Sequence, residues 1–408
     1  MRAEFADQFK VAESVKAVDV SIVMPCLNEA ICLARCIANA RVALAMIALQ
    51  HGLLGEIVIA DNGSTDGSQA IAVAEGARVV PVARRGYGAA MIGGGEGAAG
   101  RYIVFGDADG SYDFRESCAM IGELERGADL CMGSRFRGGI AAGAMPWKNR
   151  YIGNPILTGV LNVLYRAKVS DAHCGLRAIT RETFDGLRLS GSGMDFASEM
   201  VIKAALQKRR ITEVPATLSV DLRDRAPHLR PWRDGWRHLR YLFMLSPASV
   251  FTVPAVIGFV VAALIFAAAL LQQADPALPQ RFGNYWVVAA SAIAALSHQA
   301  IVFGLAAHLY GVRQGYRPSG PKSAALAGLV SLETMLLVGF ALAVGGAGVL
   351  VTTALSWSDR HFGPTYSVLP AVGGTLLVML GLQNVFGGFL LSIIGGNEAR
   401  FLGAGKSA

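Results

Sequence analysis

Two aspartates two positions apart, Asp107 and Asp109, follow an apolar run at 102–105. Paired carboxylates at the end of a strand can share a hard divalent cation with the phosphates of a nucleotide. Mg²⁺ or Mn²⁺ held there would neutralise the charge that develops on a departing diphosphate. A solvated acidic turn has the same spacing, so an isolated Asp-x-Asp pair does not establish this chemistry. The residues around the pair decide between the two interpretations.

Further residues with functional potential follow the other apolar runs of the first half. They are Pro25, Asn28 and Glu29 after the first run, Asp61 after the second, and Gly86 and Gly88 in the segment RGYGAA. Because the carboxyl ends of parallel strands meet at one edge of a sheet, these residues are expected to line a common ligand crevice. Taken singly, Asn28 could cap a helix and DNGSTDG (61–67) could form an Asx-rich turn. A Gly-x-Gly sequence is likewise too common to identify a phosphate-binding loop alone.

Short β-rich runs alternate with helical stretches through the first half of the chain. The runs lie at 18–27, 56–63, 77–83, 101–109 and 129–135, and the helical stretches at 28–52, 67–76 and 114–126. Nearly continuous apolar runs that end on Gly-, Asp- or Pro-rich turns are typical of buried parallel strands. The alternation therefore predicts an α/β, Rossmann-like layer with its ligand crevice at the carboxyl ends of the strands.

The composition indicates a second part of the chain that sits in lipid. Hydrophobic residues make up 53% of the 408 residues and charged residues only 16%, against roughly a quarter in soluble domains. Each apolar stretch after Pro247 has at least the ~20 residues that cross a bilayer core. The four stretches lie at 248–271, 285–310, 323–354 and 369–395. We therefore expect an α/β domain at 1–245 and a transmembrane domain of about four helices at 246–408.

Basic residues predict the orientation of these spans. Six arginines lie in the stretch 223–245 before the first span, and the connector 311–322 carries three basic residues. The other two connectors contain one arginine each. Because cytoplasmic segments are enriched in Lys and Arg, the α/β domain, the middle connector and both termini are expected in the cytoplasm, as in a multi-pass protein of the cytoplasmic (inner) membrane. The stretch 223–245 also has the basic and aromatic character of a segment that lies on an anionic membrane surface.

Other features add smaller expectations. Six cysteines lie in the first half without a Cys-x-x-Cys pair, which favours buried, reduced thiols over a zinc site. The first 19 residues contain no apolar run, so no cleavable signal peptide is expected. The net charge of +7 fits an anionic membrane surface or phosphate-bearing substrates. Inside the spans, His298 and Glu333 either contact each other or belong to ordinary interhelical hydrogen bonds that fix packing.

Taken together, the motifs resemble those of family-2 inverting glycosyltransferases of the GT-A fold. The closer resemblance is to the polyprenyl-phosphate sugar transferases, the dolichyl-phosphate mannose or glucose synthase type. It is carried by PCLNE (25–29), DNGSTD (61–66), RGYGAA (85–90), GDADGSYD (106–113), GSR (133–135) and DAHCGLR (171–177). The resemblance implies that Asp61 reads the nucleobase, that Pro25, Asn28 and Glu29 lie along the nucleoside, and that Asp107 and Asp109 flank the metal. Gly86 and Gly88 would belong to the donor site.

The same resemblance places an acceptor phosphate near Arg135 and the segment 171–177. Arg177 could bind this phosphate with both arms of its guanidinium. Asp171 would order Arg177, order the metal shell, or act as a general base. Glu199 matches another acidic position of the family, although an ordinary residue on a helix surface has the same appearance.

Arg225 and Arg230 stand where many relatives carry an Arg-x-x-Gly-x-Ser-Lys loop, but the Gly and Ser are missing here. Both arginines could grip phosphates, or serve the basic stretch that lies on the membrane.

The predicted function is transfer of one sugar, with inversion, from a nucleotide sugar to a polyprenyl phosphate at the cytoplasmic membrane face. UDP-glucose is the first expectation for the donor and GDP-mannose the second. The expected partners are these substrates and the membrane, not nucleic acid; a homo-oligomer is left open. A processive polysaccharide synthase is one alternative, but its usual preceding spans and Gln-x-x-Arg-Trp motif are absent from this sequence. A non-catalytic nucleotide-binding scaffold is another, and it gives no reason for keeping Asp107, Asp109 and Asp171.

Overall fold

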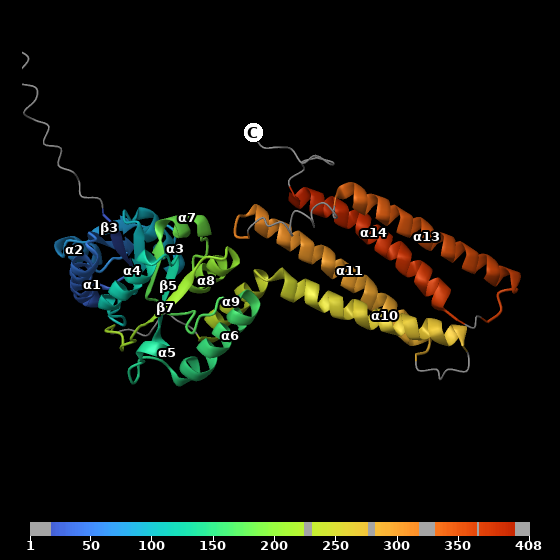
Figure 1. Cartoon of the computed structure of the whole chain (residues 1–408), viewed down its shortest axis with the longest axis horizontal. Coiled ribbons are helices and arrows are strands. Elements are labelled where there is room, and N and C mark those ends of the chain that lie inside the picture. The colour runs from blue at the N-terminus through green and yellow to red at the C-terminus, as the bar shows by residue number, and fades with distance from the viewer. Residues whose placement is uncertain (1–17, 224–230, 276–281, 318–330, 365–366, 396–408) are drawn as a thin grey trace, which may run out of the picture. The chain divides into compact units, whose positions relative to one another are not determined.

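The computed structural model describes residues 18–223, 231–275, 282–317, 331–364 and 367–395 (Figure 1). The chain divides into two compact units, Met1–Leu242 and Phe243–Ala408. The first unit is built on a β-sheet, and the second consists of long helices.

A seven-stranded mixed sheet forms the centre of the first unit, with the strand order β3-β2-β1-β4-β6-β5-β7. Strand β6 is antiparallel to β4 and β5, and the other pairings are parallel. The strands are β1 (Val20–Cys26), β2 (Gly55–Asp61), β3 (Arg78–Pro81), β4 (Tyr102–Phe105), β5 (Leu130–Ser134), β6 (Arg177–Thr180) and β7 (Ile211–Pro215). Cys26 pairs with Asp61 in register, so β1 and β2 end at the same edge. The loops that follow them therefore start side by side.

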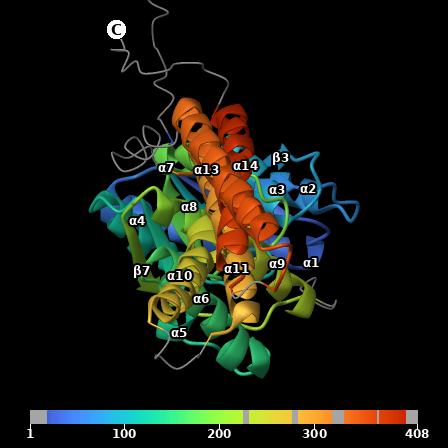
Figure 2. The same cartoon turned by 90° about the vertical axis from the view of Figure 1, so that its right-hand side faces the viewer.

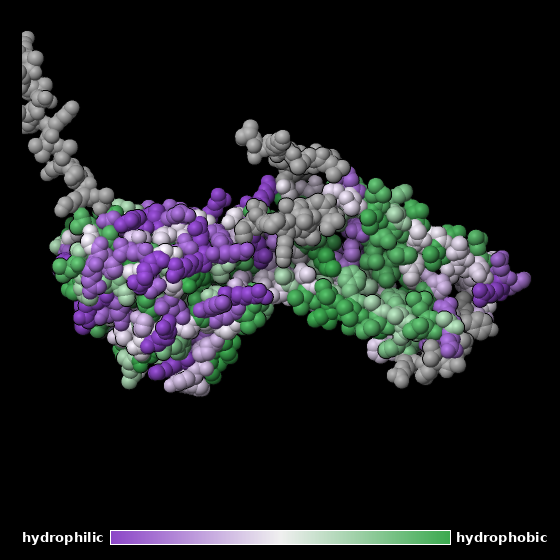
Figure 3. Space-filling view, viewed as in Figure 1, coloured by the Kyte–Doolittle hydropathy of each residue, from purple (hydrophilic) through white to green (hydrophobic). Residues whose placement is uncertain are grey.

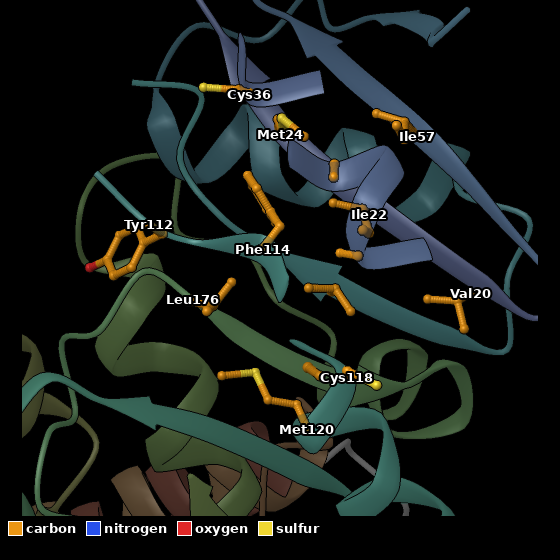
Figure 4. Close-up of a cluster of buried hydrophobic side chains, with 14 of the residues drawn as sticks. Val20, Ile22, Met24, Cys36, Ile57, Tyr112, Phe114, Cys118, Met120 and Leu176 are labelled. Carbon is orange, nitrogen blue, oxygen red and sulfur yellow. The ribbon is translucent and has the colours of Figure 1, made fainter. Parts of the chain in front are cut away.

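Helices cover both faces of this sheet. Helices α1 (Ala30–His51) and α4 (Ser117–Glu125) pack on one face, and α3 (Tyr87–Gly97) packs on the other. Figure 4 shows part of the buried cluster on the first face, which includes Ile22 and Met24 of β1, Cys36 of α1, Met120 of α4 and Phe114. Alternate residues of β1 face opposite helices, because successive side chains of a strand point to opposite sides. This two-sided burial explains why β1 reads as a continuous apolar run.

The five predicted β-rich runs form β1 to β5, and all five point in the same direction. The three predicted helical stretches contain α1, α2 (Ser68–Ala74), and a short 3-10 turn (Phe114–Glu116) followed by α4. Strands β6 and β7 were not predicted. The remaining elements of the first unit are α5 (Arg135–Gly138), a π-helical turn (Asn149–Gly153), α6 (Asn154–Tyr165), α7 (Arg181–Leu187), α8 (Phe196–Leu206) and α9 (Pro231–Met244), which runs into the second unit.

Four long helices make up most of the second unit: α10 (Val253–Ala274), α11 (Asn284–Arg313), α13 (Leu332–Asp359) and α14 (Leu369–Gly395). Each of the four predicted apolar stretches overlaps one of them; α14 coincides with its prediction, and α10, α11 and α13 extend beyond the predicted limits. Their length and composition suffice to cross a membrane, and Figure 3 shows hydrophobic side chains over much of their outer surface. Helix α1 also meets the length and composition criteria, but one side of it is buried against the sheet. We therefore assign α1 to the α/β domain.

A polar contact joins two of these helices. His298 of α11 and Gln383 of α14 are hydrogen-bonded at 3.0 Å. The alternative partner considered from the sequence, Glu333, lies in the first turn of α13. The interhelical hydrogen bond is thus confirmed, with Gln383 as the partner; its role in fixing the packing stays a prediction.

Helices α13 and α14 run side by side (Figure 2) and meet through glycines. A Cβ atom on Gly339 would lie 2.7 Å from the carbonyl oxygen of Gly381, and one on Gly346 would lie 2.6 Å from that of Gly374. Gly339 and Gly346 are seven residues apart on α13, and Gly374 and Gly381 are seven residues apart on α14. The two glycines of each helix therefore lie on one face of it. Small residues at such positions let two helix backbones approach closely in lipid.

We predict that Gly381→Leu destabilises this helix pair, because a Cβ there would lie 2.5 Å from the carbonyl oxygen of Gly339. Overpacking of this kind costs about 1–3 kcal/mol. Gly345→Leu is the matched control, since a Cβ at Gly345 meets nothing within 4 Å. Thermal unfolding in detergent should show a loss for the first variant alone. An equal loss in both would contradict the close packing.

Candidate active site

The loops after β1 and β2 interlock at the carboxyl edge of the sheet. Asn28 has a φ of 58°, a left-handed conformation that Asn tolerates better than most residues. Its Oδ1 accepts a hydrogen bond from the Thr65 backbone N–H at 2.8 Å, and its own N–H donates to Ser64 Oγ at 3.0 Å. The alternative role of Asn28 as a helix cap is wrong, because Glu29 occupies the cap position of α1. The Ala30 N–H donates instead to Asp66 Oδ2 of the neighbouring loop.

Asp61 ends β2 and organises the loop that follows it. Its carboxylate accepts hydrogen bonds from the backbone N–H groups of Gly63 and Ser64 and from Gln69 Nε2 at 2.6 Å. Burial raises the pKa of Asp61, but hydrogen bonds from Ser64 and Gln69 outweigh it and hold the pKa below its usual value. The predicted Asx-rich turn is confirmed. The reading of a nucleobase by Asp61 stays a prediction.

Asp107 and Asp109 follow β4 at the same edge. Asp107 Oδ1 accepts a hydrogen bond from the Tyr87 hydroxyl at 2.9 Å. Burial and the neighbouring charge of Asp109 raise the pKa of Asp107 to about 6. Asp109 Oδ1 is occupied by the N–H and hydroxyl of Ser111, at 3.0 and 2.6 Å. The second oxygen of Asp109, Oδ2, lies 3.2 Å from Nη1 of Arg223.

These two carboxylates fit a hard divalent cation. They are oxygen donors, and burial together with the charge of Asp109 raises the pKa of Asp107; a bound cation would relieve the repulsion between the two carboxylates. The described part of the chain holds no group of three or more His, Cys, Asp or Glu side chains that could form a metal site alone. A cation here would thus rely on two protein carboxylates plus oxygens of a substrate, which is a common arrangement for Mg²⁺ with nucleotides.

Arg223 lies beside Glu29 and Asp109. From the sequence it is predicted only as one residue of the basic stretch 223–245. Its Nε and Nη2 contact the two carboxylate oxygens of Glu29, both at 3.0 Å. Its Nη1 lies 3.2 Å from Asp109 Oδ2. The guanidinium therefore joins the loop after β1 to the loop after β4. Glu29 is 5% exposed and takes part in a buried ion pair, so its nucleoside contact stays a prediction.

Asp171 pairs with Arg135 and not with Arg177. Arg135 donates through Nε and Nη2 to the two oxygens of Asp171, at 2.7 and 2.8 Å, and its backbone N–H adds a third bond. Burial raises the pKa of Asp171, but the bonds and charge of Arg135 outweigh it, so the pKa is lowered. A buried carboxylate held in this way is a poor proton acceptor. The expectation that Asp171 orders Arg177 is corrected, and its use as a general base does not fit.

Arg177 is buried, with 2% of its surface exposed. Its Nη1 donates to the Ala197 carbonyl at 3.0 Å, and its Nη2 donates to the Cys174 carbonyl. Burial lowers its pKa, while the negative charge of Asp107 among others opposes this. In this structure both terminal nitrogens of Arg177 bind backbone carbonyls, and its role as an acceptor-phosphate ligand stays a prediction. Arg177 acts as an internal cation that lowers the pKa of Asp107.

Gly86 and Gly88 allow a close backbone approach at the start of α3. Gly86 has a φ of 127°, and a Cβ there would lie 2.2 Å from the Ser192 carbonyl oxygen. A Cβ on Gly88 would lie 2.2 Å from the Gly191 carbonyl oxygen. The segment 190–193 therefore packs directly on these two glycines. Their spacing has a packing explanation, and a contact with donor phosphates remains only a prediction.

Glu199 holds the segment 190–193 in place. It is fully buried and accepts hydrogen bonds from the backbone N–H groups of Ser190, at 3.0 Å, and Gly191, at 2.7 Å. Lys203 Nζ lies 2.7 Å from its Oε1. The alternative interpretation of Glu199 as a helix surface residue is wrong. Because 190–193 packs on the start of α3, which carries Tyr87, Glu199 indirectly supports the hydroxyl that binds Asp107.

The basic stretch is joined to the site segment 171–177 through α9. His238 of α9 is buried, and Ser198 Oγ lies 2.8 Å from its Nδ1 and 3.3 Å from His173 Nε2. The two histidine rings meet edge to face at 4.8 Å. Burial, with a smaller effect of His238, lowers the pKa of His173 to about 3, so its ring is neutral at physiological pH. Arg225 and Arg230, two predicted phosphate ligands, lie outside the described residues.

Comparisons with known proteins agree with this geometry. Residues 21–188 match Glycosyl transferase family 2, and residues 305–395 match the Glycosyltransferase family 2 C-terminal transmembrane region. The Low-salt glycan biosynthesis hexosyltransferase Agl6 of Haloferax volcanii is 34% identical over 391 residues, which cover 94% of this chain and 91% of that protein. The mixed sheet, the paired aspartates at its edge and these matches define an enzyme of the GT-A glycosyltransferase class with C-terminal membrane helices. The chain belongs to glycosyltransferase family 2.

Other relatives share less of this chain and are less identical to it. The Polyprenol monophosphomannose synthase of Mycolicibacterium smegmatis is 30% identical over 176 residues, covering 40% of this chain and 66% of that protein. The Dolichol-phosphate mannosyltransferase of Pyrococcus furiosus is 27% identical over 232 residues, covering 55% and 63%. Among solved structures, glucosyl-3-phosphoglycerate synthase from Mycobacterium tuberculosis, in complex with UDP, aligns with a TM-score of 0.41 and 22% identity over 56% of this chain and 78% of that one. That structural likeness is too distant to assign a ligand.

We predict that Glu199→Gln destabilises the α/β domain. The variant removes a buried negative charge beside Lys203 and weakens the bonds to the segment 190–193, and breaking a buried ion pair costs about 3–5 kcal/mol. Glu182→Gln is the control, because the Glu182 side chain is 84% exposed in its ion pair with Arg209 and should contribute about 0–1 kcal/mol. Thermal unfolding of both variants measures the difference. Equal stability would show that Glu199 has no supporting role.

Proposed function

We propose that the enzyme transfers one hexose from a nucleoside diphosphate sugar to the phosphate of a polyprenyl phosphate, with inversion, at the cytoplasmic face of the membrane. The observation that carries this proposal is the pair Asp107 and Asp109 at the sheet edge of a chain that continues into four membrane-length helices. A metal-binding pair suits a diphosphate donor, and an attached membrane domain suits a lipid acceptor. The printed names of two relatives, a polyprenol monophosphomannose synthase and a dolichol-phosphate mannosyltransferase, support the acceptor class.

On the donor side, Asp107 and Asp109 would hold Mg²⁺ or Mn²⁺ against the diphosphate. The cation supplies charge neutralisation for the departing nucleotide. Tyr87 fixes the orientation of Asp107, and Ser111 fixes that of Asp109. Asp61, Pro25 and the loops around them would line the nucleoside, as the carboxyl edge of an α/β sheet does for nucleotides in general.

On the acceptor side, the nucleophile needs orientation more than deprotonation. A lipid phosphate already carries negative charge at neutral pH, so no protein base has to remove a proton. This fits the occupied carboxylate of Asp171, which serves to hold the Arg135 guanidinium in one orientation. Among the arginines that the structure describes, we propose Arg135 as the ligand of the acceptor phosphate. A single in-line displacement by the phosphate oxygen inverts the anomeric centre.

The membrane arrangement follows from charge and from α9. The basic stretch before the first span and the basic connector 311–322 favour a cytoplasmic active site by the positive-inside tendency. Helix α9 packs through His238 against the segment 171–177, so a helix from the basic stretch lies beside the proposed acceptor site. We propose that this places the acceptor phosphate at headgroup level.

The direct test incubates the purified full chain with undecaprenyl phosphate and, separately, radiolabelled UDP-glucose or GDP-mannose. We expect one sugar per lipid, with the anomeric configuration opposite to that of the donor when read by NMR. Both donors are tested because recognition of the sugar hydroxyls and of the nucleobase depends on loop geometry. A growing polysaccharide would support the processive alternative. Nucleotide binding without transfer to any polyprenyl phosphate would support the scaffold alternative.

We predict that Asp109→Asn lowers turnover by about 100-fold or more, because it removes a carboxylate from the site that neutralises transition-state charge. Excess EDTA should abolish wild-type activity, and added Mg²⁺ or Mn²⁺ should restore it. The matched control is Asp113→Asn in the same segment, since Asp113 caps a short helical turn and pairs with Arg115. Its activity should stay near that of wild type. Full activity in EDTA would exclude the metal role.

A further inference from the structure

Arg223 makes an unusual set of contacts in the site. Two of its nitrogens, Nε and Nη2, bind the carboxylate of Glu29, and the third, Nη1, reaches Asp109 Oδ2 at 3.2 Å. The Arg223 side chain is only 19% exposed, and those of Glu29 and Asp109 are 5% and 10% exposed. Partial burial makes such charge pairs stronger than exposed ones and holds the guanidinium in place.

The oxygen that Arg223 contacts is the one that a metal ion needs. Asp109 Oδ1 already accepts two hydrogen bonds from Ser111, which leaves Oδ2 as its outward oxygen. A guanidinium nitrogen and a divalent cation on the same oxygen would repel each other, since both are positive. Arg223 Nη1 therefore lies on the oxygen that a cation bound to Asp109 would use.

Arg223 can give up its contact with Asp109 and keep its two contacts with Glu29. Nε and Nη2 form a two-pronged pair with Glu29, which can persist, and the contact with Asp109 uses Nη1 alone. A nucleoside diphosphate bound with its cation brings anionic oxygens to the same carboxylates. Arginine is well suited to such oxygens because its planar fork can hold a carboxylate with one edge and offer the remaining nitrogen to a phosphate.

We propose that Arg223 is a charge-exchange residue. Without a cation it neutralises Asp109; with the divalent cation and the donor bound, it releases Asp109 and binds the donor diphosphate while staying on Glu29. This inference rests on the proposed function, because it assumes a nucleoside diphosphate donor. It predicts cooperative binding, in which the cation binds weakly alone and tightly with nucleotide. It also assigns Glu29 the role of positioning Arg223.

The charges of the site agree with this exchange. Glu29, Asp107 and Asp109 supply three negative charges, and Arg223 and the enclosed Arg177 supply two positive ones. Adding a divalent cation makes the cluster net positive, which favours an anionic diphosphate and no longer favours Arg223 beside the metal. Binding of the anionic diphosphate then offsets this net positive charge.

The test compares Arg223→Gln with wild type in the full chain in detergent, using Mn²⁺, UDP and GDP as probes. Mn²⁺ binding without nucleotide is measured by the EPR signal of free Mn²⁺, and nucleotide binding at saturating Mn²⁺ is measured by calorimetry. We expect Arg223→Gln to tighten Mn²⁺ binding alone, by about tenfold, because the competing charge is gone. We expect it to weaken binding of the nucleotide that wild type prefers, by about tenfold or more, because a charge-assisted contact is lost.

Opposite changes in the affinity for Mn²⁺ and in the affinity for nucleotide distinguish charge exchange from a structural role of Arg223. Loss of a structural role would weaken the binding of both ligands. Weakening of both, or a change in neither, would overturn the exchange. Arg115→Gln is the control, because Arg115 pairs with Asp113 at an exposed position and should leave both affinities unchanged. Arg223→Lys provides a second variant that keeps the charge. It should weaken nucleotide binding while leaving Mn²⁺ binding alone close to wild type.

Failure of the inference and failure of the proposed function give different results. If wild type binds neither Mn²⁺ nor UDP or GDP, the proposed donor chemistry is wrong and the inference falls with it. If wild type binds both, but Arg223→Gln shifts them in the same direction, only the exchange is wrong. Thermal unfolding of each variant shows that the compared proteins are folded.

Discussion

Mutual repulsion among carboxylates at one edge of the sheet is the constraint on which the rest of the site depends. Asp107 and Asp109 are close enough that the charge of Asp109 helps raise the pKa of Asp107. Arg223 binds Asp109 directly, and the buried Arg177 opposes the shift of Asp107. The pair can remain close because cations, hydroxyl donors and backbone N–H groups surround it. Carboxylates that attract the positive charge of arginine side chains can also bind a metal ion.

The surrounding elements hold this edge rigid by contacts between segments far apart in the chain. Asn28 and Asp66 tie the loops after β1 and β2 together. On the other side of the sheet, Glu199 and Lys203 hold the segment 190–193, which packs on the glycines at the start of α3. Tyr87 then carries this support to Asp107 through one hydrogen bond. Such supporting contacts keep charged groups in a working geometry before any ligand arrives.

The sequence allowed prediction of the elements whose signal is local. Strands β1 to β5 are apolar runs that end on turn residues, so they and the aspartates that follow β4 could be predicted. Strand β6 has four residues, begins with Arg177 and is antiparallel, and none of these features marks a buried strand. Partners could not be predicted, because they depend on folding: Arg135 and Asp171 are 36 residues apart, and Arg223 and Glu29 are 194 apart. For the same reason, the sequence left open whether Glu199 is a site residue or an ordinary residue on a helix surface.

The burial of all six thiols has a practical meaning for later work on this enzyme. None of them is exposed, and burial raises the pKa of Cys36, Cys131 and Cys174 to about 12. At neutral pH roughly one in 10⁵ of these three side chains is then a thiolate, the form that alkylating reagents attack. We therefore expect thiol reagents to react slowly with the buried cysteines of the natural chain. Spectroscopic probes can be attached at a single engineered surface position without first replacing six residues of a packed core.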